Sequence, residues 1–225
     1  MIEIGNNKKS AKIQNQKQRQ NIKTKYLTKK RKDTTAPKKT NLILKPITNL
    51  DEKSLYQIVR NPSVMKYVGN GKPWSLSKVK KFISYNLEED KLSSNDTRTY
   101  YSFKIIDSNK PKLIFGVIEF HIFPQLSISD NTNKKYKKYK KYKNQYFLTI
   151  YLHPRSQGKG IAIGSINLLI EKIKEVKPKL KTLYSMVNIN NGKMIKFSEK
   201  HQFKLVDKHI SFHNKKFNIY QINVL

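Results

Sequence analysis

The amino-acid sequence predicts an α/β fold in which helices flank a mixed β-sheet. Residues 146–152, Tyr-Phe-Leu-Thr-Ile-Tyr-Leu, are almost continuously apolar, which is typical of a central strand covered on both faces. Apolar residues then recur at helical spacing from residue 160 to about 176, which predicts a long helix. The predicted strands and helices do not alternate as a repeating strand–helix–strand series, so we expect a mixed sheet.

Before residue 146, the sequence predicts two helices and three strands. Asp51 can cap the first helix, which stops before Pro62, and Ser75 or Ser77 begins the second. A turn at 107–111 joins two of the strands. The strands, which are rich in apolar and aromatic residues, are predicted at 42–46, 99–106 and 113–123.

After the long helix, the sequence predicts a shorter helix and three strands. Pro178 ends the long helix, and the shorter helix is expected at 191–201. The strands are predicted at 183–187, 203–206 and 218–224. Residues 207–217 are expected to connect the last two strands.

The positive charge is concentrated in two segments. The chain has 225 residues, with 47 Lys and Arg against 15 Asp and Glu, and a formal net charge of +32. Residues 1–40 carry +11 and residues 133–143 carry +7, which leaves +14 elsewhere. Because residues 1–40 contain few large apolar side chains, we expect a disordered Lys-rich tail followed by one domain at 41–225.

Residues 133–143 contain a repeated Lys-Lys-Tyr unit within a predicted loop at about 125–144. One interpretation is a low-complexity loop inserted between two strands. The other is a nucleic-acid contact, in which lysines neutralise phosphates and tyrosines stack on single-stranded bases. Only five of the 47 basic residues are Arg, the residue favoured for contacts to bases and phosphates. No zinc-finger spacing, basic zipper or RNP-type aromatic pattern accompanies the repeat.

Several classes of protein are excluded by composition. The chain has no Cys, which excludes disulfides, Cys-based zinc sites and a Cys nucleophile. Its five His show no metal-ligand spacing, so no metal is expected. No apolar run reaches 18 residues, and the N-terminus has no apolar signal-peptide region. We therefore expect a soluble intracellular protein, in either the cytoplasm or the nucleus.

The stretch 152–162, Leu-His-Pro-Arg-Ser-Gln-Gly-Lys-Gly-Ile-Ala, predicts an anion site. A buried strand ends, a tight turn follows, and a helix begins with unpaired N–H groups and a positive dipole end. Gly158 and Gly160 allow the backbone to approach a ligand closely, and Arg155 and Lys159 add positive charge. A pyrophosphate is the anion that such a site suits best. The alternative is an ordinary Gly-containing turn.

Two common phosphate-binding motifs do not match this stretch. The Walker A string Gly-x4-Gly-Lys-[Ser/Thr] does not occur. The dinucleotide fingerprint Gly-x-Gly-x-x-Gly fails because the third glycine, Gly164, comes one residue late, and the next strand ends in Val187-Asn188 rather than an acidic residue. Gln157-Gly-Lys-Gly-Ile-Ala162 instead fits Gln/Arg-x-x-Gly-x-Gly/Ala. On this motif the chain resembles the GNAT N-acetyltransferase superfamily, whose loop of this form binds acetyl-CoA.

A second motif supports the resemblance. The family pattern Asn-x-x-Ala-x-x-x-Tyr-Glu-Lys-x-Gly-Phe agrees here at Asn191, Glu199, Lys200 and Phe203. Met194, Ser198 and Gln202 replace its Ala, Tyr and Gly. The resemblance covers residues 42–224. The opening Leu-Ile-Leu-Lys-Pro and residues 61–67 look most like the ribosomal-protein (Rim-type) branch.

The resemblance implies a mostly antiparallel sheet and an acetyl-CoA-dependent N-acetyltransferase without a metal. The pantetheine arm would lie beside strand residues 149–153, where a backbone N–H polarises the thioester carbonyl. Asn191 would bond the pantetheine, or cap its helix, or do both. The residues implied to bind acetyl-CoA are Leu152, His153, Gln157, Gly158, Lys159, Gly160, Ile161, Ala162 and Asn191.

The implied chemistry needs a neutral acceptor amine, so a general base is expected. Glu119 is the candidate base, and the alternative is a solvent-facing or salt-bridged glutamate. Ser198 occupies the position of the family's Tyr general acid, but Ser is a poor acid. Either Tyr146 or Tyr151 substitutes for it, or the thiolate leaves unaided. Trp74 lies where family acceptor sites form, and the alternative is simple packing.

The sequence thus predicts transfer of an acetyl group from acetyl-CoA to a primary amine, at a protein N-terminus or a Lys. The alternative is a basic nucleic-acid-binding protein on a degenerate acetyltransferase scaffold. In either case the Lys-rich tail and loop are expected to contact polyanions.

Overall fold

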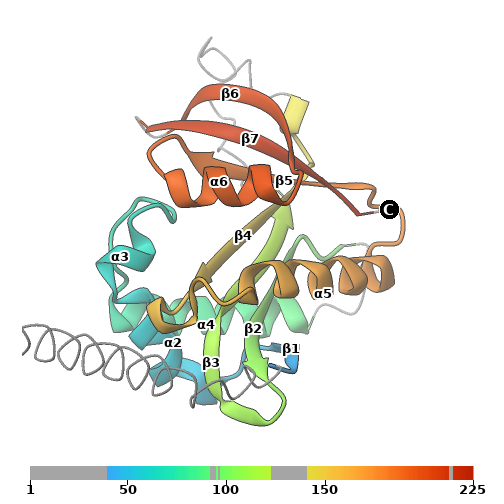
Figure 1. Cartoon of the computed structure of the whole chain (residues 1–225). Helices are drawn as coiled ribbons and strands as arrows, with labels where there is room; N and C mark the ends of the chain where they lie inside the picture. Colours follow the sequence, from blue (N-terminus) through green and yellow to red (C-terminus); the bar gives the residue numbers. More distant parts are fainter. Residues whose placement is uncertain (1–39, 92–94, 96, 123–140, 213–214, 225) are drawn as a thin grey trace, which may run out of the picture. The chain divides into compact units, whose positions relative to one another are not determined.

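Figure 1 shows a computed structural model of the chain, in which the structure describes residues 40–91, 95, 97–122, 141–212 and 215–224. Nearly all of the predicted tail and most of the predicted Lys/Tyr loop lie outside the described residues. Residues 41–225 form one unit by themselves.

A seven-stranded sheet in the order β1-β2-β3-β4-β5-β7-β6 is the centre of this unit. Neighbouring strands pair antiparallel, except β4 and β5, which run parallel. The predicted mixed, mostly antiparallel sheet is therefore confirmed. Its strands are β1 (Leu42–Pro46), β2 (Tyr100–Asp107), β3 (Lys110–Ile122), β4 (Tyr146–Leu152), β5 (Thr182–Asn188), β6 (Lys204–Phe212) and β7 (Lys215–Asn223).

Helices cover both faces of the sheet. One apolar cluster joins α5 and residues of α6 to one face, and a second joins α2 and α4 to the other. Figure 1 shows α5 and α6 in front of the strands and α4 behind β2 and β3. The helices are α2 (Glu52–Val59), α3 (Pro62–Met65), α4 (Leu76–Asp90), α5 (Ile161–Val176) and α6 (Gly192–Lys200), with 3-10 turns at Asn49–Asp51 and Pro154–Ser156.

Pro62 both follows one helix and begins another. Helix α2 ends at Val59, as expected from the proline. Pro62 is also the first residue of α3, a short helix that the sequence does not predict. Proline suits that position because the first N–H of a helix has no intrahelical partner. The Asn61 side chain caps α3 by accepting from the Ser63 N–H at 2.9 Å.

The expected connection at 207–217 is wrong, because β6 continues to Phe212 and β7 begins at Lys215. Strand β6 lies at the edge of the sheet, where charged side chains and irregularities are common and hide the apolar alternation of a strand. Its register against β7 shifts twice between Leu205 and Ile210, and His209 has a positive φ of 53°.

The last tyrosine of the Lys-Lys-Tyr repeat lies within the described residues and is buried. The Tyr142 ring packs edge-on against Phe147 and Tyr184, with centroid distances of 5.7 and 5.2 Å. Its hydroxyl donates to Asp207, which also pairs with Lys141 at 2.6 Å. This tyrosine is therefore part of a small core and is not available to stack on a base.

Asp51 links the 3-10 turn before α2 to strand β2 of the sheet. Its carboxylate accepts from the Thr48 N–H and hydroxyl at 2.7 and 2.9 Å, and from the Lys104 ammonium of β2 at 2.7 Å. Both side chains of the ion pair are mostly buried, at 10% exposed for Asp51 and 14% for Lys104. The prediction that Asp51 caps the first helix is wrong, because its side chain makes no cap bond to α2 and instead completes the capping box of the 3-10 turn before it. Removing the carboxylate would lose this bond and leave a largely buried ammonium without its partner.

We expect Asp51→Ala to lower the free energy of unfolding by about 2–4 kcal/mol, measured by urea denaturation. The double variant Asp51→Ala/Lys104→Met should recover part of this loss, because it also removes the unpaired charge. A loss below about 0.5 kcal/mol in the single variant would mean that the pair contributes no more than an exposed one.

Helix α6 ends in a Schellman motif that explains the glycine of the family pattern. The Phe203 N–H donates to the Ser198 carbonyl at 2.9 Å, and the Gln202 N–H donates to the Glu199 carbonyl at 3.1 Å. Phe203 also packs edge-on against Phe197, as the motif requires. Gln202 is left in the left-handed region, with φ of 58°, where glycine is favoured.

Gln202→Gly should therefore stabilise the protein by about 0.5–1 kcal/mol, because relief of the left-handed strain exceeds the added flexibility of the unfolded chain. A higher Tm in calorimetry is the expected result. An unchanged or lower Tm would show that Gln202 gains compensating contacts.

Candidate active site

Strands β4 and β5 diverge after their shared register pair (Figure 1), and we call the stretch where they are not paired the gap. They share one register pair, Phe147 with Tyr184, near the start of each strand. The His153 N–H donates to the Phe115 carbonyl of β3 at 2.8 Å. Because backbone groups alternate sides along a strand, the N–H of Leu152 points away from β3, into the gap. An extended ligand can lie there as if it were an extra strand.

A 3-10 turn links β4 to helix α5. A ring nitrogen of His153 accepts from the Arg155 N–H at 3.2 Å and so caps the turn, with Pro154 at its first position. The Gln157 side-chain amide donates to the Leu152 carbonyl at 3.1 Å. These two bonds hold the loop against the end of β4, beside the gap.

The glycines of the loop form an open cradle at the N-terminus of α5. Gly158 and Gly160 have φ of 72° and 75°, and a Cβ on either would meet no atom within 4 Å. Helix α5 begins at Ile161 with Gly160 as a cap that has no side chain, so the first N–H groups of the helix have no intrahelical partner. Arg155 and Lys159 are exposed beside them. This geometry fits a pyrophosphate.

Glu119 lies on the opposite face of the sheet from α5. The pairing of β2, β3 and β4 places Ser102, Glu119 and Thr149 side by side. Tyr151, two residues beyond Thr149, shares this face, and its hydroxyl donates to Glu119 Oε1 at 2.9 Å. Glu119 is only 7% exposed, and among the described residues no basic side chain forms a salt bridge with it. It is therefore neither solvent-facing nor salt-bridged.

Burial raises the pKa of the Glu119 carboxyl, while the charge of His121 and hydrogen bonds from Tyr151 and Tyr100 oppose the rise. For both tyrosines, burial and the negative charge of Glu119 raise the pKa well above 10. The tyrosines therefore stay protonated and act as hydrogen-bond donors to the carboxylate. A buried carboxylate with a raised pKa and, among the described residues, no salt bridge is suited to accept a proton.

Trp74 closes the outer side of this cluster. Its ring packs edge-on against Phe82 at 5.3 Å and lies 6.2 Å from the Tyr151 ring. The Lys78 ammonium stands 4.7 Å from the Trp74 ring centroid. Trp74 thus packs against α4 and also adjoins the tyrosine that contacts Glu119.

The structure does not bring Tyr146 to Glu119. Tyr146 pairs with Ile122 in the β3–β4 ladder and packs against Phe120, on the face covered by α5. Its hydroxyl donates to the Arg98 carbonyl at 3.3 Å. Tyr146 and Tyr151 are five residues apart, so they point to opposite faces of β4. Thr149 lies opposite Glu119, and side chains two residues apart on a strand share a face. Tyr151 therefore lies on the face of Glu119 and Tyr146 does not, and this alternation is the signal that could have identified Tyr151 from the sequence.

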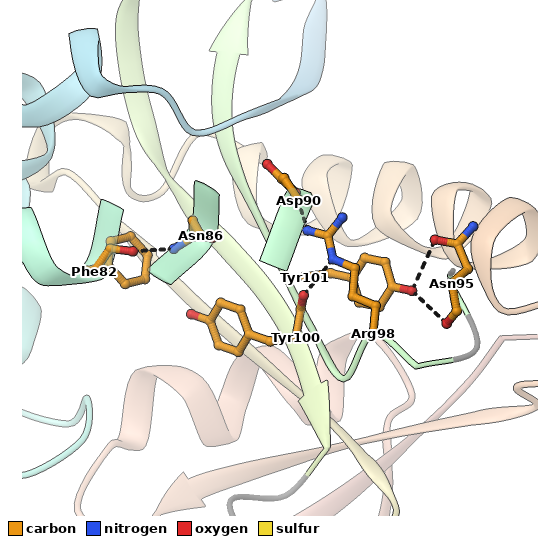
Figure 2. Close-up of polar contacts among 7 residues, drawn as sticks. All are labelled: Phe82, Asn86, Asp90, Asn95, Arg98, Tyr100 and Tyr101. Carbon is orange, nitrogen blue, oxygen red and sulfur yellow. Dashed lines mark hydrogen bonds and ion pairs between the residues drawn. The ribbon is translucent and has the colours of Figure 1, made fainter. Parts of the chain in front are cut away.

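Arg98 has a structural role beside the start of β2 (Figure 2). Its guanidinium lies 4.3 Å from the Tyr101 ring centroid, donates to the Tyr100 carbonyl at 2.9 Å and pairs with Asp90 of α4. The Tyr101 hydroxyl points to Asn95 on the other side (Figure 2). These contacts fix the backbone from which the Tyr100 side chain reaches Glu119.

Two residues of the second motif serve α6 itself. The Asn191 side-chain oxygen accepts from the Met194 N–H at 3.3 Å, which confirms the helix-cap interpretation and leaves the side-chain NH2 for a ligand. Ser198 is fully buried, and its hydroxyl donates to the Met194 carbonyl at 2.9 Å. With its proton engaged inside the helix, Ser198 is poorly placed to protonate a leaving group.

The described part of the chain contains neither a cluster of metal ligands nor a helix that could span a membrane. No group of three or more His, Asp or Glu side chains there is arranged to hold a metal ion. No helix in that part is long and apolar enough to cross a membrane.

Residues 41–204 match the family described as acetyltransferase (GNAT) domain. No curated protein matches the chain by sequence. Three solved structures show the same fold. The spermidine N-acetyltransferase from Vibrio cholerae, in complex with CoA and spermine, is 18% identical over 81% of this chain and 95% of its own, with a TM-score of 0.58.

The second is an acetyltransferase from Salmonella typhimurium that modifies the N-terminal serine of ribosomal protein L7/L12. It is 16% identical over 83% of this chain and 97% of its own, with a TM-score of 0.60. The third is an aminoglycoside acetyltransferase in complex with coenzyme A. It is 14% identical over 81% of this chain and 94% of its own, with a TM-score of 0.59.

Proposed function

The chain belongs to the GNAT acetyltransferase family, and we propose that it transfers an acetyl group from acetyl-CoA directly to a primary amine at a protein N-terminus or a Lys. One observation carries this proposal. Strand β4 pairs with β5 only at Phe147, the glycine cradle follows shortly after the end of β4, and Thr149 within β4 pairs with Glu119 of β3. A donor bound by its phosphates at the cradle can thus extend along β4 and present its reactive end to an amine held near Glu119.

Acetyl-CoA supplies the acetyl group as a thioester. The N–H groups of Gly158, Lys159, Gly160, Ile161 and Ala162 would hold its pyrophosphate, helped by the charge of Lys159. The gap-facing N–H of Leu152 would polarise the thioester carbonyl. The free NH2 of Asn191 would bond the pantetheine. His153 and Gln157 would act by holding the loop, through the bonds described above.

Glu119 would take a proton from the acceptor ammonium, directly or through one water molecule. The neutral nitrogen then bonds to the acetyl carbon, the carbon–sulfur bond breaks, and the sulfur leaves with the bonding electrons as the CoA thiolate. The nitrogen loses its second proton to the thiolate, through solvent, which gives the amide and the free thiol of CoA. Tyr151 would be a positioning residue, because its hydroxyl holds the Glu119 carboxylate. We assign no general acid, since Tyr146 and Ser198 both donate to backbone carbonyls away from Glu119.

Two considerations support a protein amine over a polyamine or an amino sugar. The chain is strongly basic, which disfavours an acceptor with several positive charges. The first strand and residues 61–67 resemble the ribosomal-protein branch, and a similar structure modifies an N-terminal serine. An α-amine, with a pKa of about 8, also needs less help from a base than a Lys does.

The nucleic-acid alternative depended on the departures at Ser198 and Gln202. Neither departure disrupts the site, since Gln202 completes the Schellman motif and the glycine cradle is open. We therefore do not propose nucleic-acid binding as the function.

The proposal is tested by titrating acetyl-CoA calorimetrically and by measuring acetyl transfer to N-terminal peptides, Lys peptides, polyamines and amino sugars. We expect acetyl-CoA binding in the micromolar range and the highest kcat/KM with a peptide. Absence of binding at submillimolar acetyl-CoA would overturn the function, and a preference for polyamines would overturn the acceptor class.

A further inference from the structure

Much of the layer that covers the Glu119 face is basic. From Lys53 to Leu87 the chain contains no acidic residue, and every basic residue in this range is exposed. The range comprises most of α2, all of α3 and most of α4, the elements that pack on this face. Its basic residues are Lys53, Arg60, Lys66, Lys72, Lys78, Lys80 and Lys81.

Part of this layer is a strap, residues 66–74, that is tied to the far half of the sheet. The Tyr67 hydroxyl donates to the Asn190 carbonyl at 2.8 Å, directly before the cap of α6. The Lys215 ammonium of β7 donates to the Asn70 carbonyl at 3.0 Å. The strap therefore runs from α3 to the strands beyond the gap, and it brings the positive charge of Lys215 to the same place.

The strap ends at the wall of the site. Trp74, its last residue, lies 6.2 Å from the Tyr151 ring, and the Tyr151 hydroxyl contacts Glu119 at 2.9 Å. The Lys78 ammonium stands over the Trp74 ring at 4.7 Å. Among the described residues, none of the salt bridges involves Lys66, Lys72 or Lys78. Their charge is thus available to an incoming molecule.

We propose that the acceptor is a peptide that carries acidic side chains close behind its reacting amine, and that the lysines of the strap and Lys78 contact those side chains. This inference rests on the proposed function. The buried Glu119 accommodates one ammonium, whereas a second or third positive charge would meet the lysines outside it. Opposite charge at the mouth of a site raises the rate of encounter, and like charge lowers it.

The test compares three peptides with the same N-terminal serine and with acidic, neutral or basic residues at positions 2–4, using the full chain. We expect kcat/KM for the acidic peptide to exceed that for the basic one by about 10-fold or more at low salt. The ratio should shrink as salt rises, because screening weakens the attraction. In the variant Lys72→Glu/Lys78→Glu the preference should be lost or reversed.

Lys112→Glu is the matched control, because Lys112 is also exposed but lies on β3 at the β2–β3 hairpin. It should retain the preference, and both variants should bind acetyl-CoA as the unaltered chain does. Equal kcat/KM for the three peptides would overturn the inference but leave the proposed function standing. Absence of transfer to any amine would overturn the proposed function itself.

A third outcome would also overturn the inference. A single-stranded oligonucleotide that binds the unaltered chain but not Lys72→Glu/Lys78→Glu, together with no peptide preference, would assign the basic layer to nucleic acid.

Discussion

Glu119→Gln is expected to lower kcat by about 10²–10⁴-fold, the range typical of removing a general base. Glutamine has nearly the same shape as glutamate and can still accept the hydrogen bond from the Tyr151 hydroxyl, but it cannot take a proton from the acceptor. Binding of acetyl-CoA should not change, because the glycine cradle lies beyond the end of β4, whereas Glu119 pairs with Thr149 in the middle of that strand. Steady-state kinetics and calorimetry separate the two quantities.

The same variant should be more stable than the unaltered chain at neutral pH. Burial raises the pKa of Glu119 in the folded state, so its charged form opposes folding. The stability that the neutral carboxyl contributes is fully present below the ordinary pKa of the unfolded chain. It is lost as pH rises through the raised pKa of the folded chain. The amide of the variant does not titrate and has no such dependence. We therefore expect a higher Tm at pH 7 and little difference below pH 4, whereas general damage to the fold would lower Tm at both.

The pH profile gives a second test of the base. In the unaltered chain, kcat/KM should fall as pH drops through the raised pKa of Glu119, because a protonated carboxyl cannot accept a proton. Tyr151→Phe removes a hydrogen bond that lowers this pKa, so the acidic limb should move to higher pH. If Glu119→Gln keeps kcat within about threefold, Glu119 is not the base.

Gly160→Glu is expected to weaken acetyl-CoA binding by at least about 100-fold. A side chain at Gly160 would project into the open space of the cradle, and its carboxylate would repel the phosphates. The backbone at φ 75° would add about 1–2 kcal/mol of strain. Calorimetric titration measures the loss, and retention of binding within threefold would show that the loop does not hold the pyrophosphate.

Gly69→Glu is the matched control for this variant. Gly69 also has a positive φ, 52°, and open space around its Cβ position, but it lies in the loop after α3. It should suffer similar strain and the same change of charge while binding acetyl-CoA normally. A comparable fall in Tm for both variants would assign the loss of binding in Gly160→Glu to the cradle.

Most elements could be predicted because their signals are local. The apolar run of β4, the periodicity of α5 and the proline after α2 each act within a few residues. The sequence does not predict the full length of the last two strands, β6 and β7. Strand β6 lies at the sheet edge and its register is irregular, so an alternation of apolar and polar residues does not reveal its pairing with β7. Helix α3 is too short to show a period.

The site divides in the same way. The loop from Gln157 to Ala162 was found from sequence because glycine conformation and a helix N-terminus are properties of consecutive residues. The sequence does not distinguish Tyr151 from Tyr146 and does not exclude Ser198. The partner of Tyr151 comes from another strand, and the partner of Ser198 is a backbone carbonyl inside its own helix.

The sequence by itself thus determines where the glycine cradle forms and which family the chain resembles. Both can be recognised from consecutive residues, because the cradle depends on short-range backbone geometry. The three-dimensional fold alone shows that β4 and β5 separate after Phe147, that Tyr151 rather than Tyr146 meets Glu119, and that a basic strap crosses to Asn190. These features arise from strand register and from contacts between residues more than 30 positions apart, and no local pattern encodes them.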